Sequence, residues 1–298
     1  MKEQRILLPN SIQLHVKHSE GDKPAVLFLH FSGGTSDMWH GILPQFAADY
    51  RIIAPDLRGH GRSDKPDTGY HIDDMAHDVY LLLTKLNIER CHIVGSSMGA
   101  EVGLSLAASH PKLIDSFICE GALYNEFGEW GMFNGSAEEN ANKKAEMKVE
   151  LSKRQVPVCR TKEEFVMQAR APFEQQGLWN EQVAAFVDST AMEAADGSFT
   201  SHYSNRVRTE YIEKYWELRF EDYYQKLKCP VLFLPSEEEW SNEQIRASMK
   251  HFATLVPSYE VLRIPESLHA YVWMQKPQEA GAAAKSFIDR VEDDRGDN

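Results

Sequence analysis

Basic residues are scarce in this 298-residue sequence. It contains 32 lysines and arginines against 45 aspartates and glutamates, which gives a formal net charge of -13 at pH 7. Phosphate backbones and anionic membrane surfaces bind proteins through basic faces, because that attraction is largely electrostatic. We therefore expect neither nucleic acid nor a membrane among the partners of this chain, and we expect a small-molecule substrate instead.

Long apolar runs and cysteines are also rare. No apolar stretch reaches the roughly 18 residues of a membrane span, and the first ten residues lack the apolar core of a signal peptide, so we expect a cytoplasmic protein. The chain has four cysteines, none of them in a C-x-x-C spacing: Cys91, Cys119, Cys159 and Cys229. They fit small core residues in a reducing compartment rather than a disulfide framework or a zinc site, and we expect neither a metal nor another cofactor.

Short apolar runs alternate with helical patterns over most of the chain. An opening hairpin is predicted from residues 5–8 and 12–16, and the later runs are apolar throughout, as in strands that are covered on both faces. Strands that alternate with helices form a parallel sheet with helices on both faces. We therefore predict an α/β fold whose further strands lie at residues 25–29, 51–55, 91–94, 114–119, 230–234 and 259–264.

This alternation stops between residues 123 and 228. The segment has no strand-length apolar run and shows only helical patterns, at residues 137–154, 162–170, 181–190 and 209–218. It also holds sixteen of the 31 aromatic residues, which can form its own core and an apolar lid over a pocket. We predict a core domain from residues 1–122 and 229–298, and a helical cap from residues 123–228.

The sequence Gly95-Ser96-Ser97-Met98-Gly99 joins a predicted strand to a predicted helix. The pattern G-x-S-x-G in this context is typical of a nucleophile elbow, in which the serine occupies a sharp turn and needs small neighbours two residues before and after it. Gly95 and Gly99 meet this need for Ser97. The backbone N–H of Met98 would then lie at a helix N-terminus, where it can stabilise a developing oxyanion.

A serine nucleophile needs a base, and the base needs an orienting carboxylate. His269 follows the last predicted strand, and Glu237, Glu238 and Glu239 follow the strand before it. The carboxyl ends of parallel strands meet at one edge of a sheet, so Ser97, His269 and one of these glutamates are expected to meet there. The helix after the glutamates is predicted to begin at a Ser241 cap.

Taken together, these segments resemble the α/β-hydrolase fold family, over nearly the whole chain apart from the predicted cap. The nucleophile, the acid and the histidine also follow one another in that family's order. The resemblance implies an eight-stranded, mostly parallel sheet with helices on both faces and an inserted helical cap. It also implies a triad of Ser97, Glu239 and His269, and an oxyanion hole from the backbone N–H groups of Ser32 and Met98. The matching segments are residues 29–34, 56–63, 95–99, 230–234 and 269–277.

Three residues depart from the family's usual pattern. Phe31 replaces a glycine and is expected to crowd the oxyanion loop, Ser236 replaces a glycine, and Glu239 replaces an aspartate. Glutamate reaches one methylene further than aspartate, so Glu239 could meet the imidazole from a withdrawn backbone. Glu238 is the alternative acid for the same reason.

The expected function is a serine hydrolase of carboxylesterase type, which acts through an acyl-enzyme on a small, largely apolar ester or thioester. A serine nucleophile argues against the family's dehalogenases and epoxide hydrolases, which use aspartate. Carbon–carbon bond hydrolysis or other triad chemistry on this fold is the first alternative. A small-molecule sensing or signalling protein with little turnover is the second, because fold does not fix function.

Overall fold

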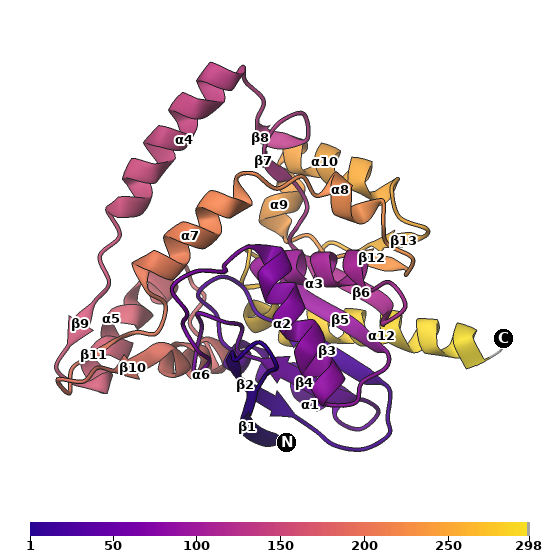
Figure 1. Cartoon of the computed structure of the whole chain (residues 1–298), viewed down its shortest axis with the longest axis horizontal. Helices are drawn as coiled ribbons and strands as arrows, with labels where there is room; N and C mark the ends of the chain where they lie inside the picture. Colours follow the sequence, from indigo (N-terminus) through magenta and orange to yellow (C-terminus); the bar gives the residue numbers. More distant parts are fainter. Residues whose placement is uncertain (297–298) are drawn as a thin grey trace.

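A mixed sheet of eight strands forms the centre of the described residues 1–296 in a computed structural model of the chain (Figure 1). The strand order is β1-β2-β4-β3-β5-β6-β12-β13; β2 is antiparallel to β1 and β4, and the other neighbours are parallel. The predicted eight-stranded, mostly parallel sheet is therefore confirmed. Its strands are β1 (Lys2–Leu7), β2 (Gln13–His18), β3 (Ala25–Leu29), β4 (Arg51–Pro55), β5 (Cys91–Ser96), β6 (Ile114–Glu120), β12 (Val231–Phe233) and β13 (Tyr259–Val261).

Helices cover both faces of this sheet, as predicted, because alternate residues of each strand enter two different apolar cores. In β3, Leu27 and Leu29 pack in one core, whereas Val26 and Phe28 pack in the other. The first core is closed by α2 (Ile72–Lys85), α3 (Met98–Ser109) and α10 (Glu243–Ala253). The opposite core is closed by the 3-10 helix η1 (Ser36–Trp39), α1 (Leu43–Phe46), α11 (Val272–Gln275) and α12 (Pro277–Gly296).

The segment from residue 123 to residue 228 is mainly helical, but the prediction that it contains only helices is wrong. Short strands form two small sheets in it, and strands of two or three residues are too short to show a period in the sequence. Its helices are α4 (Ala137–Ser152), α5 (Lys162–Gln175), α6 (Glu181–Thr190), α7 (Asn205–Tyr215) and α8 (Glu221–Tyr224). Its strands are β7 (Asn125–Phe127), β8 (Gly131–Phe133), β9 (Val158–Cys159), β10 (Ala191–Glu193) and β11 (Phe199–Ser201).

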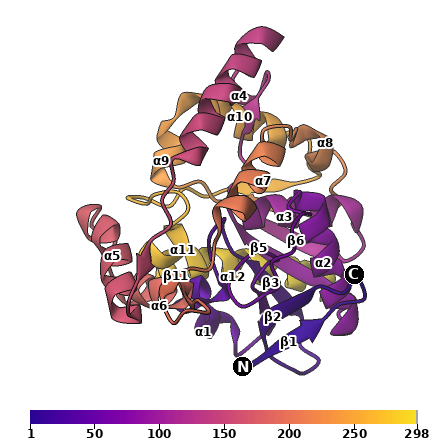
Figure 2. The same cartoon turned by 60° about the vertical axis from the view of Figure 1, so that its left-hand side comes forward.

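Helix α4 projects furthest from the sheet, and α7 lies beside it (Figures 1 and 2). Leu151 is the buried residue of α4, so the helix is exposed along most of its length. A capping box stabilises the N-terminus of α4: the Ser136 hydroxyl accepts the backbone N–H of Glu139, and the Glu139 carboxylate accepts that of Ser136. Within residues 1–296, no helix combines the length and the apolar character that a bilayer span requires.

Candidate active site

Ser97 lies between β5 and α3 with φ +49° and ψ -120°, a left-handed backbone conformation that costs energy for a residue other than glycine. Glycines around it make this turn possible. A Cβ on Gly99 would stand 2.0 Å from the carbonyl oxygen of Leu29, and a Cβ on Gly121 would stand 2.6 Å from the Cα of Ser97. A Cβ on Gly95 would likewise meet the first turn of α3. The sharp strand-to-helix turn predicted from the motif is present.

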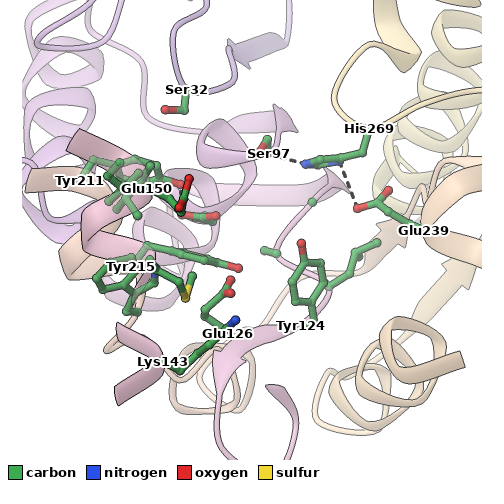
Figure 3. A pocket seen from close by; sticks show the side chains of 18 of the residues that line it. Ser32, Ser97, Tyr124, Glu126, Lys143, Glu150, Tyr211, Tyr215, Glu239 and His269 are labelled. Atoms are coloured by element: carbon green, nitrogen blue, oxygen red, sulfur yellow. Dashed lines mark hydrogen bonds and ion pairs between the residues drawn. The ribbon is translucent and has the colours of Figure 1, made fainter. Parts of the chain in front are cut away.

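His269 faces Ser97 from the loop between β13 and α11. Its Nε2 lies 3.1 Å from the Oγ of Ser97, within hydrogen-bonding distance for a base that takes the serine proton (Figure 3). The adjacent Ser96 has a different environment, because its buried hydroxyl donates to Glu120 Oε2 at 2.5 Å. Only Ser97 of these two serines lines the large cavity described below.

Two glutamates contact the other ring nitrogen of His269. Glu239 Oε1 lies 3.1 Å from Nδ1, and Glu120 Oε1 lies 2.7 Å from the same atom, in hydrogen-bonding geometry. The alternative acid, Glu238, accepts a hydrogen bond from the backbone N–H of His269 at 3.2 Å. The structure therefore brings Ser97, His269 and Glu239 together as the sequence predicts, and it adds Glu120.

Sequence reasoning missed Glu120 because it directly follows the predicted strand at residues 114–119 and belongs to none of the motifs. It is the last residue of β6 and fully buried. In the parallel pairing of β5 with β6, Glu120 is the partner of Ser96, so it lies next to the nucleophile turn. A carboxylate at the carboxyl end of an apolar strand was the signal that could have identified it.

Glu239 lies in a short helix that the sequence does not predict, and the predicted helix after it begins one residue later than expected. Ser236 caps the short helix α9 (Glu237–Ser241), and Asn242, in place of the predicted Ser241, caps α10. In the capping box of α9, Glu239 Oε2 accepts the backbone N–H of Ser236 at 3.0 Å and its hydroxyl at 2.9 Å. Only Oε1 of Glu239 remains for the imidazole.

The two buried glutamates and the partly buried His269 shift one another's pKa values. Burial alone would lower the pKa of His269, but the charges of Glu239 and Glu120 raise it well above its usual value. Burial also raises the pKa of Glu120, and the neighbouring Glu239 charge adds to that shift. The pKa of Glu239 is lowered, because the His269 charge and the Ser236 hydrogen bonds outweigh its burial. Glu239 is therefore the carboxylate that remains ionised, whereas Glu120 more readily holds a proton.

The expected oxyanion groups lie on adjoining segments. Met98 is the first residue of α3, so its backbone N–H belongs to the unsatisfied N-terminus of that helix. The close approach of Gly99 to Leu29 packs this turn against the loop that carries Ser32, which also lines the cavity. Phe31 is not placed as expected, because its ring packs on Phe186 and Tyr271 and lies outside the set of residues that line the cavity.

A cavity of about 640 Å³ opens in front of Ser97, between the core and the segment of residues 123–228. Its wall is less apolar than the sequence suggests, since carboxylates and tyrosines alternate around it (Figure 3). The lining residues from α4 are Lys143, Glu146, Met147, Glu150 and Leu151, and those from α7 and its end are Tyr211, Ile212, Tyr215 and Trp216.

Two clusters in the described residues have the donor types of a metal site. His92, Asp115 and Glu292 form one, but Asp115 already pairs with Arg90 and Arg295. Glu120, Glu239 and His269 form the other, with their ligand atoms within 4.8 Å of one another. In this second cluster the Nδ1 atom that a cation would need is engaged by carboxylates, so the arrangement fits a base with its orienting acids.

Comparisons with known proteins agree with this fold. The sequence model of the alpha/beta hydrolase fold family matches residues 24–273. An uncharacterized protein of Mycobacterium bovis is 37% identical over 125 residues, which cover 40% of this chain and 37% of that protein. The 2-(acetamidomethylene)succinate hydrolase of Mesorhizobium japonicum is 36% identical over 107 residues, which cover 36% of this chain and 38% of that enzyme. These matches span less than half the length of either curated relative.

A crystal structure of E-2-(acetamidomethylene)succinate hydrolase superimposes on the chain with a TM-score of 0.76. The superposition covers 97% of this chain and 99% of that structure at 23% sequence identity. At this identity the likeness establishes a shared fold and nothing about the substrate.

Proposed function

The chain belongs to the α/β-hydrolase fold family, and we propose that it is a serine hydrolase that cleaves carboxylic esters or thioesters through an acyl-enzyme. The observation that carries the proposal is the contact of 3.1 Å between Ser97 Oγ and His269 Nε2, at a strained strand-to-helix turn that faces a cavity. Hydrolase names among the relatives support the reaction class. The ester specificity rests on the geometry alone.

In the proposed reaction Ser97 Oγ attacks the substrate carbonyl carbon while His269 Nε2 accepts the hydroxyl proton. The backbone N–H groups of Met98 and Ser32 stabilise the oxyanion of the tetrahedral intermediate. His269 then gives its proton to the leaving alcohol or thiol, and the acyl group remains on Ser97. A water molecule, deprotonated by the same imidazole, releases the acid and restores the serine.

The carboxylates behind the imidazole serve this cycle by stabilising the imidazolium that forms in each half-reaction. We propose Glu239 and Glu120 together for this role, with Glu120 accepting the Nδ1–H hydrogen bond. Glu238 then acts only on the backbone of the histidine loop.

One observation favours the sensing alternative. The two carboxylates raise the pKa of His269, and an imidazolium cannot accept the proton of Ser97. A protein held in that state would bind a small molecule or be acylated slowly, with little turnover. If activity rises steeply as the pH increases, His269 works as the base once it has lost its proton. A low rate at every pH would favour sensing.

The proposal is tested by fluorophosphonate labelling and ester turnover. Intact-protein mass spectrometry is expected to show one adduct, and peptide mapping is expected to place it on Ser97. Ser97→Ala should abolish the adduct and the hydrolysis of p-nitrophenyl esters at unchanged thermal stability. Labelling of Ser96, or persistent turnover in Ser97→Ala, would contradict the proposed mechanism.

We also propose that the protein works in the cytoplasm. The four cysteines are buried and free, a state that a reducing compartment maintains. Detection of the tagged protein in a cell fraction other than the cytoplasm would contradict this assignment.

A further inference from the structure

The wall of the cavity that holds Ser97 has an excess of negative charge. Glu101 and Glu126 line its interior, and Glu146 and Glu150 line it from the exposed helix α4. Apart from His269, Lys143 is the basic residue among the described lining residues. Its charge lowers the pKa of Glu126, which burial raises, so the two groups partly compensate each other.

Glu101 is the carboxyl group closest in the chain to the nucleophile. Its backbone N–H donates to the carbonyl of Ser97 at 3.1 Å, one helical turn away, and both residues line the same cavity. The side chain is only 5% exposed, yet it lines the cavity. The hydroxyl of Tyr211 donates to its Oε2 at 2.8 Å, which fixes the carboxyl group in place.

The mechanism described above makes no use of Glu101. Burial raises its pKa to about 7, against the lowering effects of the Tyr211 hydrogen bond and the His269 charge. A buried carboxylate is costly unless a partner of opposite charge or further hydrogen-bond donors accompany it. Tyr211 supplies one donor, and a ligand cation in the cavity would supply the missing charge.

Aromatic side chains surround the same space. Tyr124, Tyr211, Tyr215 and Trp216 line the cavity together with Glu101. Organic cations bind to aromatic rings and carboxylates in combination, because ring faces and carboxylate oxygens both present negative potential. An anionic group in this position would instead face Glu101 and its acidic neighbours, and Lys143 is already paired with Glu146 at 3.4 Å.

We propose that the substrate of this hydrolase is an ester or thioester that carries an ammonium group, which Glu101 and the tyrosines around it bind about one helical turn from the scissile carbonyl. The inference rests on the proposed serine hydrolase function and assigns its substrate class. It makes Glu101 a specificity-determining residue that takes no part in the proton transfers.

Matched esters test this assignment, because a trimethylammonium group and a tert-butyl group have nearly the same size and shape. On the acyl side the pair is the p-nitrophenyl esters of 4-(trimethylammonio)butanoate and 5,5-dimethylhexanoate. On the alcohol side it is choline butyrate and 3,3-dimethylbutyl butyrate. The ratio of kcat/KM for the cationic ester to that for its neutral partner is measured in the wild type, in Glu101→Gln and in Glu138→Gln. Glu138 is an exposed residue of α4 outside the cavity and controls for the loss of one negative charge.

In the wild type the ratio is expected to be at least about ten for one of the two pairs, the range of a charge-assisted contact. Glu101→Gln should reduce that ratio at least about fivefold, mainly through KM of the cationic ester, and leave the neutral ester within about threefold. Glu138→Gln should retain the wild-type ratio. The amide can still accept the Tyr211 hydrogen bond, and a thermal unfolding curve checks that the fold is intact.

A ratio near or below one for both pairs, or an unchanged ratio in Glu101→Gln, would overturn the inference. The rate at which Ser97 is labelled by a trimethylammonium-bearing organophosphonate, relative to its neutral analogue, gives the same comparison if turnover is slow. Neutral esters hydrolysed without cation preference would refute the substrate class and leave the hydrolase function standing. The absence of both labelling and hydrolysis would refute the proposed function itself.

Discussion

The roles of the two carboxyl groups behind His269 can be distinguished by replacing each of them with an amide in turn. Glu120→Gln and Glu239→Gln keep the shape of each side chain, and the double variant removes both charges. Glu237→Gln is the matched control, because Glu237 lies in the same capped turn and pairs with Arg263 on the surface. The structure predicts that Glu120→Gln costs more activity than Glu239→Gln.

Coulomb's law alone would not separate the two glutamates. At an effective dielectric constant of about 20, a fully ionised carboxylate would attract the imidazolium by about 6 kcal/mol at 2.7 Å and by about 5 kcal/mol at 3.1 Å, and the raised pKa of Glu120 reduces its share of this attraction. The hydrogen bond decides between them, since Glu120 accepts the Nδ1 proton whereas Glu239 Oε1 has no hydrogen-bond partner within the described residues. In Glu120→Gln the Ser96 hydroxyl would hold the amide oxygen at the position of Oε2, so an N–H₂ group would face Nδ1 and the hydrogen bond would be lost. A hydrogen bond to a charged group contributes about 1.5–3 kcal/mol, so kcat should fall by about 10- to 150-fold.

Glu239→Gln should lower kcat less, by about tenfold or below, because the Glu120 hydrogen bond remains. The double variant should approach the loss of about 10⁴ that follows when a triad acid becomes an amide. The pH profile gives an independent readout. Each carboxylate raises the pKa of His269, so the wild-type rate should rise with pH above the usual histidine range, and each single variant should move that rise to lower pH.

The assay is steady-state hydrolysis of a p-nitrophenyl ester between about pH 5 and 9, with thermal unfolding to verify each fold. Glu237→Gln should match the wild type in rate and profile. If Glu120→Gln also matches the wild type in both, Glu120 has only a structural role and the reasoning from the hydrogen bond is wrong. A Glu239→Gln loss equal to that of the double variant would assign the acid role to Glu239 alone.

Four further substitutions test the surroundings of the site. Trp216→Ala should enlarge the cavity and favour longer acyl chains in an ester series, whereas Trp130→Ala should not, because Trp130 stacks on a histidine outside the cavity. Gly121→Ala should destabilise the fold by about 1–3 kcal/mol and slow labelling of Ser97, since φ is +123° and the new Cβ would collide with that residue; an unchanged melting temperature would contradict this. Glu238→Gln should lower kcat less than about threefold, because Glu238 accepts a hydrogen bond from the backbone of His269 and does not contact its ring nitrogens; a loss near 10⁴ would make it the acid.

Most of the sheet could be predicted because its strands are apolar on both faces and therefore appear as continuous runs. The predicted runs at residues 25–29, 51–55 and 114–119 match β3, β4 and β6 within one residue. The strands of the inserted segment could not be found in this way. β9 is two residues long and pairs with β11, forty residues further along the chain, so its existence depends on tertiary pairing that no local pattern records.

The residues of the site differ in the same way, because some can be predicted from local sequence and others depend on tertiary pairing. Ser97 can be predicted because the constraint on its turn is mainly local, and Gly95 and Gly99, two of the three glycines that satisfy it, are within two residues. Glu120 could not be found from its own neighbours, because its role depends on the register of β5 against β6 and on a histidine 149 residues later. A carboxylate at the end of an apolar strand looks like a strand boundary until that partner is known.

The departures from the family pattern at positions 236 and 239 and the presence of Glu120 are physically connected. A serine at position 236 creates a capping box, and that box holds one oxygen of Glu239 through two hydrogen bonds. Glu239 therefore faces the imidazole with a single oxygen at 3.1 Å, outside hydrogen-bonding geometry. Glu120 supplies the acceptor for Nδ1 from the end of the neighbouring strand β6, while Glu239 keeps the negative charge that the imidazolium needs. We infer that two carboxyl groups share here the function that a single acid has in the usual triad. Glu120 orients the imidazole through the Nδ1 hydrogen bond, and Glu239 supplies the negative charge.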